Sequence, residues 1–303
     1  MYDIIKGPKI NWIDIENPTK KDIDYLKKEF KFHPLILGEL IRPSHRPKVE
    51  HYRNYLFMIL YYPVYSKEKR ETRPGELDII ITKNTLITSH YTPIAPLQNL
   101  FDRCKIRSEI KKRYMNRGSD YLLYLLLTAF WKSCLVKLAR INNKIETIEN
   151  KMFQGKEKEM VREISFIKTD IINFWRIVEP QKGILESLSI EGKNFFGEDF
   201  LPYSSDVLGI YESAWNLLKT SKETILALEN TNQSLLSTKT NEIIRILTVF
   251  SVILLPLTLI ASIWGMNLFL PLERSPNGFL IILVLMLFSV GFLILFFRKK
   301  KWL

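Results

Sequence analysis

The sequence has few of the residues that mark an enzyme, a metalloprotein or a secreted protein. Its two cysteines, Cys104 and Cys134, lack metal-site spacing and are too few for a disulfide framework, so we expect a reducing compartment. The four histidines also lack metal-ligand spacing. No Gly-rich phosphate loop with a following lysine is present, so nothing suggests ATP-driven transport. With no nucleophile, base or cofactor motif, we expect neither an enzyme nor an organic cofactor.

Charge is missing from most of the last sixty residues. The runs 246–272 and 275–297 contain no Lys, Arg, Asp or Glu, and only Glu273 and Arg274 separate them. About 20 helical residues cross the roughly 30 Å hydrocarbon core of a bilayer, so each run is long enough to span it. The runs come too late in the chain for a cleaved targeting signal. We therefore predict a membrane protein with a C-terminal helical hairpin.

Neither run contains a carboxylate, and this absence would limit how the protein could move a solute across the membrane. Proton-coupled and substrate-binding transporters usually carry ionisable residues at membrane depth. Their absence favours passive flow down an electrochemical gradient.

Positive charge is in excess, with 44 Lys and Arg against 32 Asp and Glu, a net charge of +12. Beside two membrane spans, a basic surface near an anionic leaflet is a better interpretation than nucleic-acid binding. Lys239 and Arg245 precede the first span, and the basic tail follows the second. Lys and Arg accumulate on cytoplasmic flanks, so we expect a multi-pass protein of the cell inner (plasma) membrane with both termini in the cytoplasm. The tail residues are Arg298, Lys299, Lys300 and Lys301.

The body has two textures. Up to about residue 118, strand and helix signals alternate, including a hairpin across Lys83 and Asn84 and a helix start at Thr19. Residues 120–153 and 156–195 then have helical spacing, with a turn at Gly155. We predict an α+β cytoplasmic domain, a long stalk helix and two transmembrane helices. The predicted divisions are 1–118 (cytoplasmic α/β domain), 119–200 (helical hairpin arms), 203–265 (stalk helix continuing into the first transmembrane helix), 266–277 (external loop), 278–297 (second transmembrane helix) and 298–303 (basic tail).

The stalk carries an apolar stripe. Residues from Val207 to Leu235 alternate spacings of three and four, which is typical of a coiled coil. A helix over 203–265 would be roughly 90 Å long and could not be stable alone. We expect its stripe both to pack in an intramolecular bundle and to support self-association.

Within the first run, the polar residues share one helical face. At about 100° per residue, Thr248, Ser251, Thr258 and Ser262 fall within an arc of roughly 80°. Such hydroxyls can simply bond to their own helix, which is the better interpretation for a single residue. Four on one face favour a water-facing surface, and two helices cannot enclose a pore, so a conduit requires an oligomer. The predicted pore-lining residues are Asn241, Ile244, Thr248, Ser251, Leu255, Thr258 and Ser262.

The first run closes on Gly265, Met266 and Asn267. Carbonyls left free by a helix end, together with one amide per subunit, form a mouth of neutral oxygens. Such a mouth suits Mg²⁺, which dehydrates reluctantly and keeps several waters. The alternative is an ordinary helix C-cap made by Gly and Asn.

Taken together, these motifs resemble the CorA family of magnesium channels, the Gly-Met-Asn membrane proteins. The resemblance covers nearly the whole chain in order. It rests on Trp12–Ile15, Phe32–Leu35, Arg46–Glu50, Asp120–Tyr124, Thr240–Thr248, Leu255–Thr258, Trp264–Asn267 and the terminal Lys-Lys-Lys-Trp-Leu.

The resemblance implies a funnel-shaped homopentamer that admits Mg²⁺ and closes when cytoplasmic Mg²⁺ bridges acidic residues of neighbouring subunits. Gly265, Met266 and Asn267 would form the selectivity filter, and Glu39 and Asp206 match the bridging pair. Gly38 departs from relatives with a second acid there, which puts a secondary sensor site in doubt.

Three alternatives stay open. One is the transport of Zn²⁺, another the transport of Co²⁺ or Ni²⁺, by a protein of the same family. The third, from a different class, is a membrane-anchored coiled-coil scaffold without a pore. The partners expected for the first hypothesis are further copies of the chain, the lipid bilayer and divalent cations.

Overall fold

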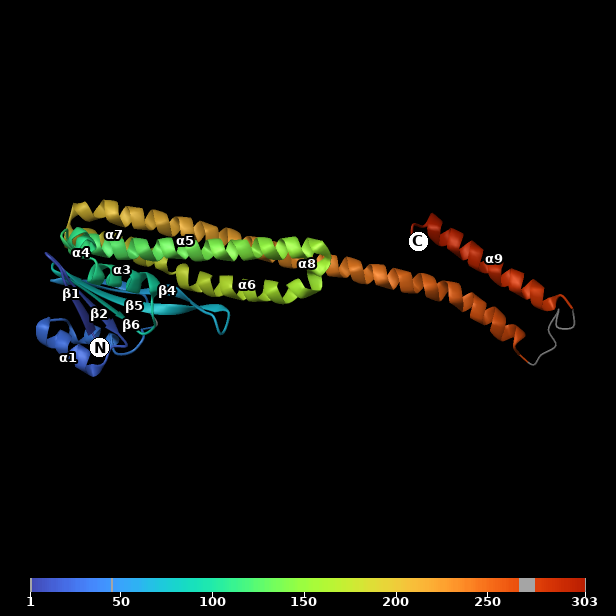
Figure 1. Cartoon of the computed structure of the whole chain (residues 1–303), viewed down its shortest axis with the longest axis horizontal. Helices are drawn as coiled ribbons and strands as arrows, with labels where there is room; N and C mark the ends of the chain where they lie inside the picture. Colours follow the sequence, from blue (N-terminus) through green and yellow to red (C-terminus); the bar gives the residue numbers. More distant parts are fainter. Residues whose placement is uncertain (1, 45, 267–275, 303) are drawn as a thin grey trace. The chain divides into compact units, whose positions relative to one another are not determined.

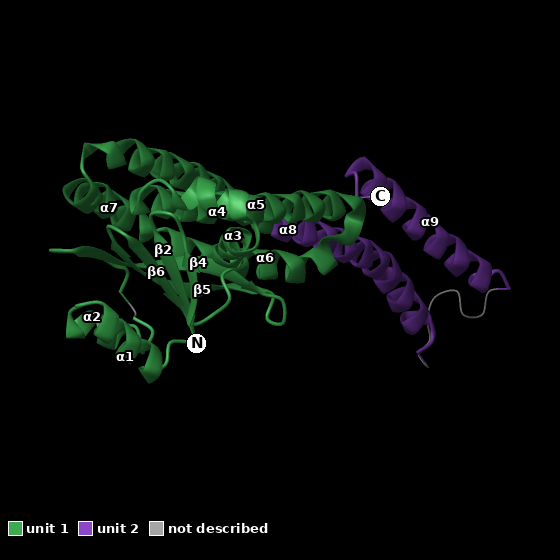
Figure 2. Ribbon diagram, turned by 60° about the vertical axis from the view of Figure 1, so that its left-hand side comes forward, with its two compact units in different colours: residues 1–229 green, residues 230–303 purple. Residues whose placement is uncertain are grey.

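A computed structural model describes residues 2–44, 46–266 and 276–302. It divides the chain into two compact units, residues 1–229 and residues 230–303, coloured separately in Figure 2. We call them the first unit and the second unit.

The first unit contains a six-stranded mixed sheet with strand order β1-β2-β6-β5-β4-β3. Strands β2 and β6 pair in parallel, and every other neighbouring pair is antiparallel. The strands are β1 (Tyr2–Lys6), β2 (Asn11–Glu16), β3 (Lys48–Tyr52), β4 (Tyr55–Ser66), β5 (Glu71–Thr82) and β6 (Thr85–His90).

Helices cover both faces of this sheet. Figure 1 shows α1 on one face and α5, α6 and α7 on the other. The helices of the first unit before the long helix are α1 (Lys20–Glu29), α2 (Pro34–Glu39), α3 (Ala95–Ile106), α4 (Ser108–Met115), α5 (Ser119–Lys151), α6 (Glu157–Val178) and α7 (Gln181–Phe196). Short helical turns follow α5 and α7 at Met152–Lys156 and Glu198–Phe200.

Local signals predicted several of these elements. The hairpin between β5 and β6 turns at residues 83 and 84, as expected, and Thr82 Oγ1 accepts the backbone N–H of Thr85 at 2.9 Å. Helix α1 starts at a capping box, in which Asp22 Oδ2 accepts the backbone N–H of Thr19 at 2.9 Å. Its buried face, Ile23 and Leu26, joins α2 and the sheet in one apolar core.

The helical part of the first unit differs from the prediction in one respect. Gly155 makes the expected turn after α5, with φ at +87°. Residues 156–195, however, do not form one helix, because α6 ends at Val178 and α7 begins at Gln181. Pro180 lies between them, and proline lacks the N–H that a helix interior needs. Helical spacing on both sides of Pro180 concealed the break.

Helix α8 runs from Leu201 to Trp264 and belongs partly to each unit. The apolar stripe predicted on it is buried in the first unit: Val207, Tyr211, Leu218 and Ile225 are all at most 2% exposed. Tyr211 packs edge-on against Trp131 of α5. From Val207 to Leu228 the stripe is therefore buried within one chain, as expected, and self-association stays a prediction.

Three helical stretches of the described chain are long and apolar enough to cross a membrane, judged by length and composition. One lies in residues 119–196, but half of its apolar window is buried against the rest of the first unit. The windows in α8 and in α9 (Gly278–Lys299) are 6% and 0% buried, so the residues that the structure describes leave their apolar surfaces uncovered. These two correspond to the runs found in the sequence.

Both cysteines are free thiols buried in the first unit. Burial raises the pKa of Cys104 to about 11 and that of Cys134 to about 12. Neither is reactive near neutral pH, because the nucleophile is the thiolate.

Candidate conduction and sensor sites

The predicted pore-lining residues, which we call the polar stripe, lie on the part of α8 in the second unit. All seven are exposed except Thr248, which is half-buried. The hydroxyls bond to their own helix: Thr248 donates to Ile244 O at 2.7 Å, Ser251 to Leu247 O at 2.9 Å and Thr258 to Leu254 O at 2.8 Å. Each hydroxyl proton is thus used, and each oxygen still has a lone pair that can accept a hydrogen bond.

The predicted selectivity filter begins where α8 ends. Gly265 N donates to Ala261 O at 2.9 Å and Met266 N to Ile263 O at 3.3 Å, so the backbone tightens after Trp264. Gly265 is not among the residues with positive φ, so it does not make the left-handed helix cap considered as an alternative. Asn267 lies outside the described residues, as does most of the predicted loop 266–277.

The predicted basic tail begins within α9 and continues beyond it. Arg298 and Lys299 form its last turn, and all four basic residues are exposed. Trp302 stacks on Phe297 with ring centroids 5.9 Å apart, and its backbone N donates to Phe297 O at 3.0 Å. This stack turns the chain back after the helix and was not predicted from the sequence.

The first sensor candidate, Glu39, ends α2 and is already paired. Its carboxylate contacts Lys48 Nζ of β3 at 3.0 Å, and Lys48 also contacts Glu50 at 2.9 Å. A divalent ion binding Glu39 would therefore have to displace Lys48. No sequence signal indicated this partner, because the contact depends on how α2 lies over the sheet.

Further carboxylates lie beside this pair. Glu76 of β5 accepts from Ser44 N at 2.7 Å and from Tyr61 Oη at 3.0 Å. Asp78, two residues along the same strand face, is 2% exposed, and neither of its oxygens has a hydrogen-bond partner. Burial, then Glu76 and Glu39, raise the pKa of Asp78 well above its ordinary value. Sequence reasoning missed both acids because they lie inside an apolar strand.

The second sensor candidate, Asp206, lies in the first turns of α8. Tyr124 Oη of α5 donates to Asp206 Oδ2 at 2.9 Å. Glu39 and Asp206 line separate surface depressions, so one chain does not bring them together. The described ranges 2–44, 46–266 and 276–302 contain no group of three or more His, Cys, Asp or Glu side chains placed to hold a metal ion.

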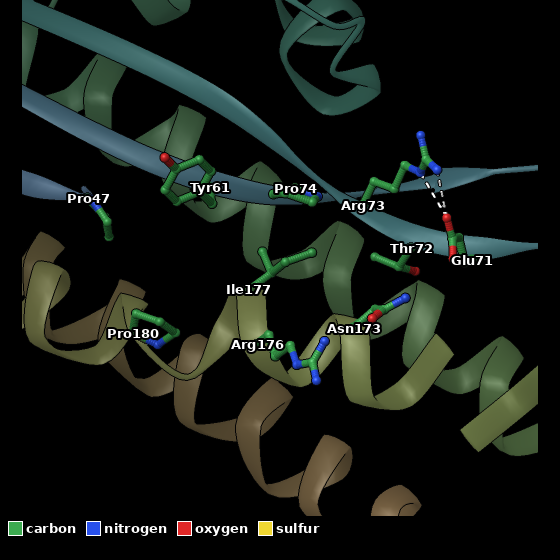
Figure 3. Close-up of a pocket in the computed structure, with 10 residues that line it drawn as sticks. All are labelled: Pro47, Tyr61, Glu71, Thr72, Arg73, Pro74, Asn173, Arg176, Ile177 and Pro180. Carbon is green, nitrogen blue, oxygen red and sulfur yellow. Dashed lines mark hydrogen bonds and ion pairs between the residues drawn. The ribbon is translucent and has the colours of Figure 1, made fainter. Parts of the chain in front are cut away.

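A cleft of about 590 Å³ opens between β5 and α6, and Figure 3 shows the residues that line it. Arg73 bonds to Glu71 at one end, while Asn173 and Arg176 come from the helix opposite. None of the predicted site residues lies in this cleft.

A mixed α+β unit, a 64-residue helix and two uncovered apolar segments long enough to cross a bilayer define a membrane protein with a large folded domain. Comparison with known families agrees. The family model described as "CorA-like Mg2+ transporter protein" matches residues 7–299, and the chain belongs to this family.

Individual relatives extend over nearly the whole chain. The cobalt/magnesium transport protein CorA of Thermotoga maritima is 29% identical over 295 residues, which cover 96% of this chain and 83% of the relative. The protein of the same name from Methanocaldococcus jannaschii is 25% identical and covers 97% and 92%. The solved CorA magnesium transporter structure from the latter organism superposes with a TM-score of 0.85 at 23% identity, covering 97% of this chain and 92% of that one. The fold predicted from sequence, apart from its assembly, is therefore confirmed.

Proposed function

We propose that this protein is a homopentameric channel through which Mg²⁺ enters the cell passively, down its electrochemical gradient. Its inner-membrane location, with both termini in the cytoplasm, is part of the proposal. Five copies of the polar stripe would line the path, with Gly265, Met266 and Asn267 at the outer mouth and the α9 helices facing lipid.

The observation that carries the proposal is the exposure of the polar stripe on α8, where every member except Thr248 is exposed and the hydroxyl oxygens keep lone pairs that can accept hydrogen bonds. Thr248, Ser251 and Thr258 donate hydrogen bonds to carbonyl oxygens of their own helix. Their remaining lone pairs can therefore only accept hydrogen bonds. A hydrated Mg²⁺ presents outward-pointing water O–H groups, which only donate. A lumen of acceptors without carboxylates suits an ion that keeps its water shell and does not trap it. The two relatives named as cobalt/magnesium transport proteins support the same class of substrate.

Regulation by cytoplasmic Mg²⁺ is the second part of the proposal. Glu39 of one subunit and Asp206 of its neighbour would bridge one ion, which competes with Lys48 for Glu39. Loss of the ion would let Lys48 Nζ return to the Glu39 carboxylate, at the observed distance of 3.0 Å. The two subunits would then no longer be bridged and would separate. Competition with an internal cation would keep the affinity low, as a sensor of an abundant ion requires.

Flux into proteoliposomes tests the conduction path. We expect Mg²⁺ uptake that Asn267→Ala abolishes and that Ser251→Ala lowers about three- to tenfold. The matched control is Ser289→Ala on α9, where the serine also bonds to its own helix, at 2.8 Å to Met286 O. Flux should not change in the control, because α9 faces lipid. Equal losses in the two serine variants would contradict the assignment of α8 as the lining helix.

A panel of divalent ions separates the alternatives. Because the relatives are named for cobalt as well as magnesium, Co²⁺ is the strongest competing substrate. Zn²⁺ or Ni²⁺ flux in preference to Mg²⁺ would replace the proposed substrate and retain the channel. No flux of any ion from protein that is correctly inserted would leave only a membrane-anchored scaffold.

A further inference from the structure

A second cleft in the first unit, of about 270 Å³, lies where the β4–β5 hairpin meets α5 and α6. Its wall contains four cationic side chains and one carboxylate. The cations are Lys67, Lys137, Arg140 and Lys144, and the carboxylate is Asp170. Even with Asp170 ionised, the cleft carries a surplus of three positive charges.

The cations outnumber the one carboxylate, Asp170, whose charge interacts with those of Lys137 and Lys144. Among the described residues, no carboxylate forms an ion pair with any of the four. Lys137 Nζ donates to Pro63 O and lies 4.2 Å from the ring centroid of Tyr62, which are both uncharged. Burial lowers the pKa of Lys137, so its ammonium is held where an anion would stabilise it.

The one carboxylate has a structural role. Asp170 is 4% exposed and accepts hydrogen bonds from Thr72 of β5, while its Oδ1 has no partner. It thus ties α6 to the sheet from beneath the cleft. Its position leaves Arg140 and Lys144, both exposed, free to meet a ligand from solvent.

Aromatic and apolar groups complete the wall. Phe174 and Ile141 are 1% and 5% exposed and form apolar surface, whereas Tyr65 is 38% exposed at the rim. Lys144 Nζ lies 5.5 Å from the Tyr65 ring centroid, so a cation and an aromatic face meet at one place. Phosphate groups select clustered Lys and Arg, and bases stack on exposed aromatic rings.

We propose that this cleft binds a nucleoside polyphosphate, with its phosphates among Lys137, Arg140 and Lys144 and its base against Tyr65. The volume of about 270 Å³ is slightly below the usual range for ligand sites, so the phosphates enter the cleft and the base remains at the rim. The site shares no residue with the proposed conduction path or sensor, and the inference does not depend on transport.

Calorimetric titration of the full-length protein in detergent tests the proposal. ATP is the probe, in low-salt buffer without divalent ions, so that chelation contributes nothing. We expect saturable binding that weakens with added salt and at least tenfold in Arg140→Gln/Lys144→Gln. The matched control, Lys112→Gln/Arg113→Gln on α4, removes the same two residue types from another exposed surface and should change the affinity less than twofold.

The role of the aromatic rim has its own measurement. Tyr65→Ala should weaken ATP several-fold and leave inorganic triphosphate unchanged. If triphosphate binds as tightly as ATP and Tyr65→Ala affects neither, the nucleoside part of the proposal is wrong. If Arg140→Gln/Lys144→Gln has a lower melting temperature than the unmodified protein, Lys67→Gln on the exposed hairpin replaces it in the titration.

Three results would overturn the proposal as a whole. One is the absence of saturable ATP binding to the unmodified protein. Another is equal weakening in the α4 control, which would mean that ATP responds only to net charge. The third is binding to vesicles containing phosphatidylglycerol, lost in the double variant, without binding of ATP, since the cleft would then recognise lipid headgroups.

Discussion

Asp78 shows how the environment of one residue can set a pH dependence. Its carboxyl is buried in β5 without hydrogen bonds, and burial followed by Glu76 and Glu39 raises its pKa, against the opposing charge of Lys48. The folded state therefore holds the Asp78 proton more tightly than the unfolded state. From about pH 4 upward, this group makes the free energy of unfolding fall as pH rises, until its folded pKa is passed.

The first prediction concerns Asp78→Asn, which keeps the shape and removes the charge. We expect the variant to melt at a higher temperature than the unmodified protein at pH 8, with the difference shrinking toward pH 5. Each pKa unit of the shift corresponds to about 1.4 kcal/mol. Thermal melts of the full chain in detergent at several pH values measure this, with Asp24→Asn, on the exposed side of α1, as the control. A variant that is less stable at every pH would contradict the prediction.

At the same scale, the proposed lining residues follow from a local pattern, whereas the contacts of the proposed sensor residues do not. Helical periodicity alone placed Thr248, Ser251 and Thr258 on one face, because all three lie within three turns of one helix. Lys48 beside Glu39 and Tyr124 beside Asp206 could not be predicted. Those contacts join elements that are distant in sequence, and no local pattern records them.

Among the elements, α7 depends on a close approach that only glycine allows. A Cβ atom at Gly192 would collide with the ring of Phe200, which is 2% exposed beneath it. This approach lets the turn at residues 198–200 pack closely against α7 before α8 begins. Glycine is needed here for space, since Gly192 does not have positive φ.

The second prediction follows from this contact. Gly192→Ala should destabilise the protein by about 1–3 kcal/mol through overpacking. Gly183→Ala, in the same helix, has nothing within 4 Å of the added methyl and should instead stabilise by up to about 1 kcal/mol through helix propensity. Denaturant or thermal unfolding of the two variants side by side measures the contrast. Destabilisation of similar size in both would mean that α7 does not tolerate alanine for another reason.

Elements with strong local signals were predicted well, and those defined by tertiary packing were not. The β5–β6 hairpin and the capping box of α1 follow from a few neighbouring residues. The edge strands β1 and β3 were missed, because their identity depends on pairing with β2 and β4. The break at Pro180 was also missed, since apolar periodicity resumes immediately after it.

For the whole molecule, the sensor hypothesis gives a third prediction. Glu39→Ala/Asp206→Ala should keep conducting at millimolar-range cytoplasmic Mg²⁺, where we expect the unmodified protein to close, because the proposed bridging ion would lose both ligands. Proteoliposome flux with controlled Mg²⁺ on the domain side measures it. Glu29→Ala/Glu223→Ala removes two exposed carboxylates elsewhere and should retain closure. Closure retained in the sensor variant would place the regulatory site elsewhere.

The assembly gives a fourth prediction. Because the apolar stripe of α8 packs within the chain from Val207 to Leu228, we expect the proposed subunits to associate through other surfaces, with the polar stripe facing the path that they enclose. Native mass spectrometry from detergent should give a particle of five times the 35.8 kDa chain mass. A stable dimer as the largest species would rule out the enclosed path, because two subunits contribute only two lining helices.

The buried thiols of Cys104 and Cys134 have a practical consequence. Because burial raises their thiol pKa values to about 11 and 12, they should not react with maleimides or methanethiosulfonates at neutral pH. Single cysteines introduced along α8 could then carry spin labels or fluorophores on an otherwise native background. Label-to-label distances at successive positions would reveal the rotational symmetry of the assembly, and quenching by water-soluble reagents would trace its wet face.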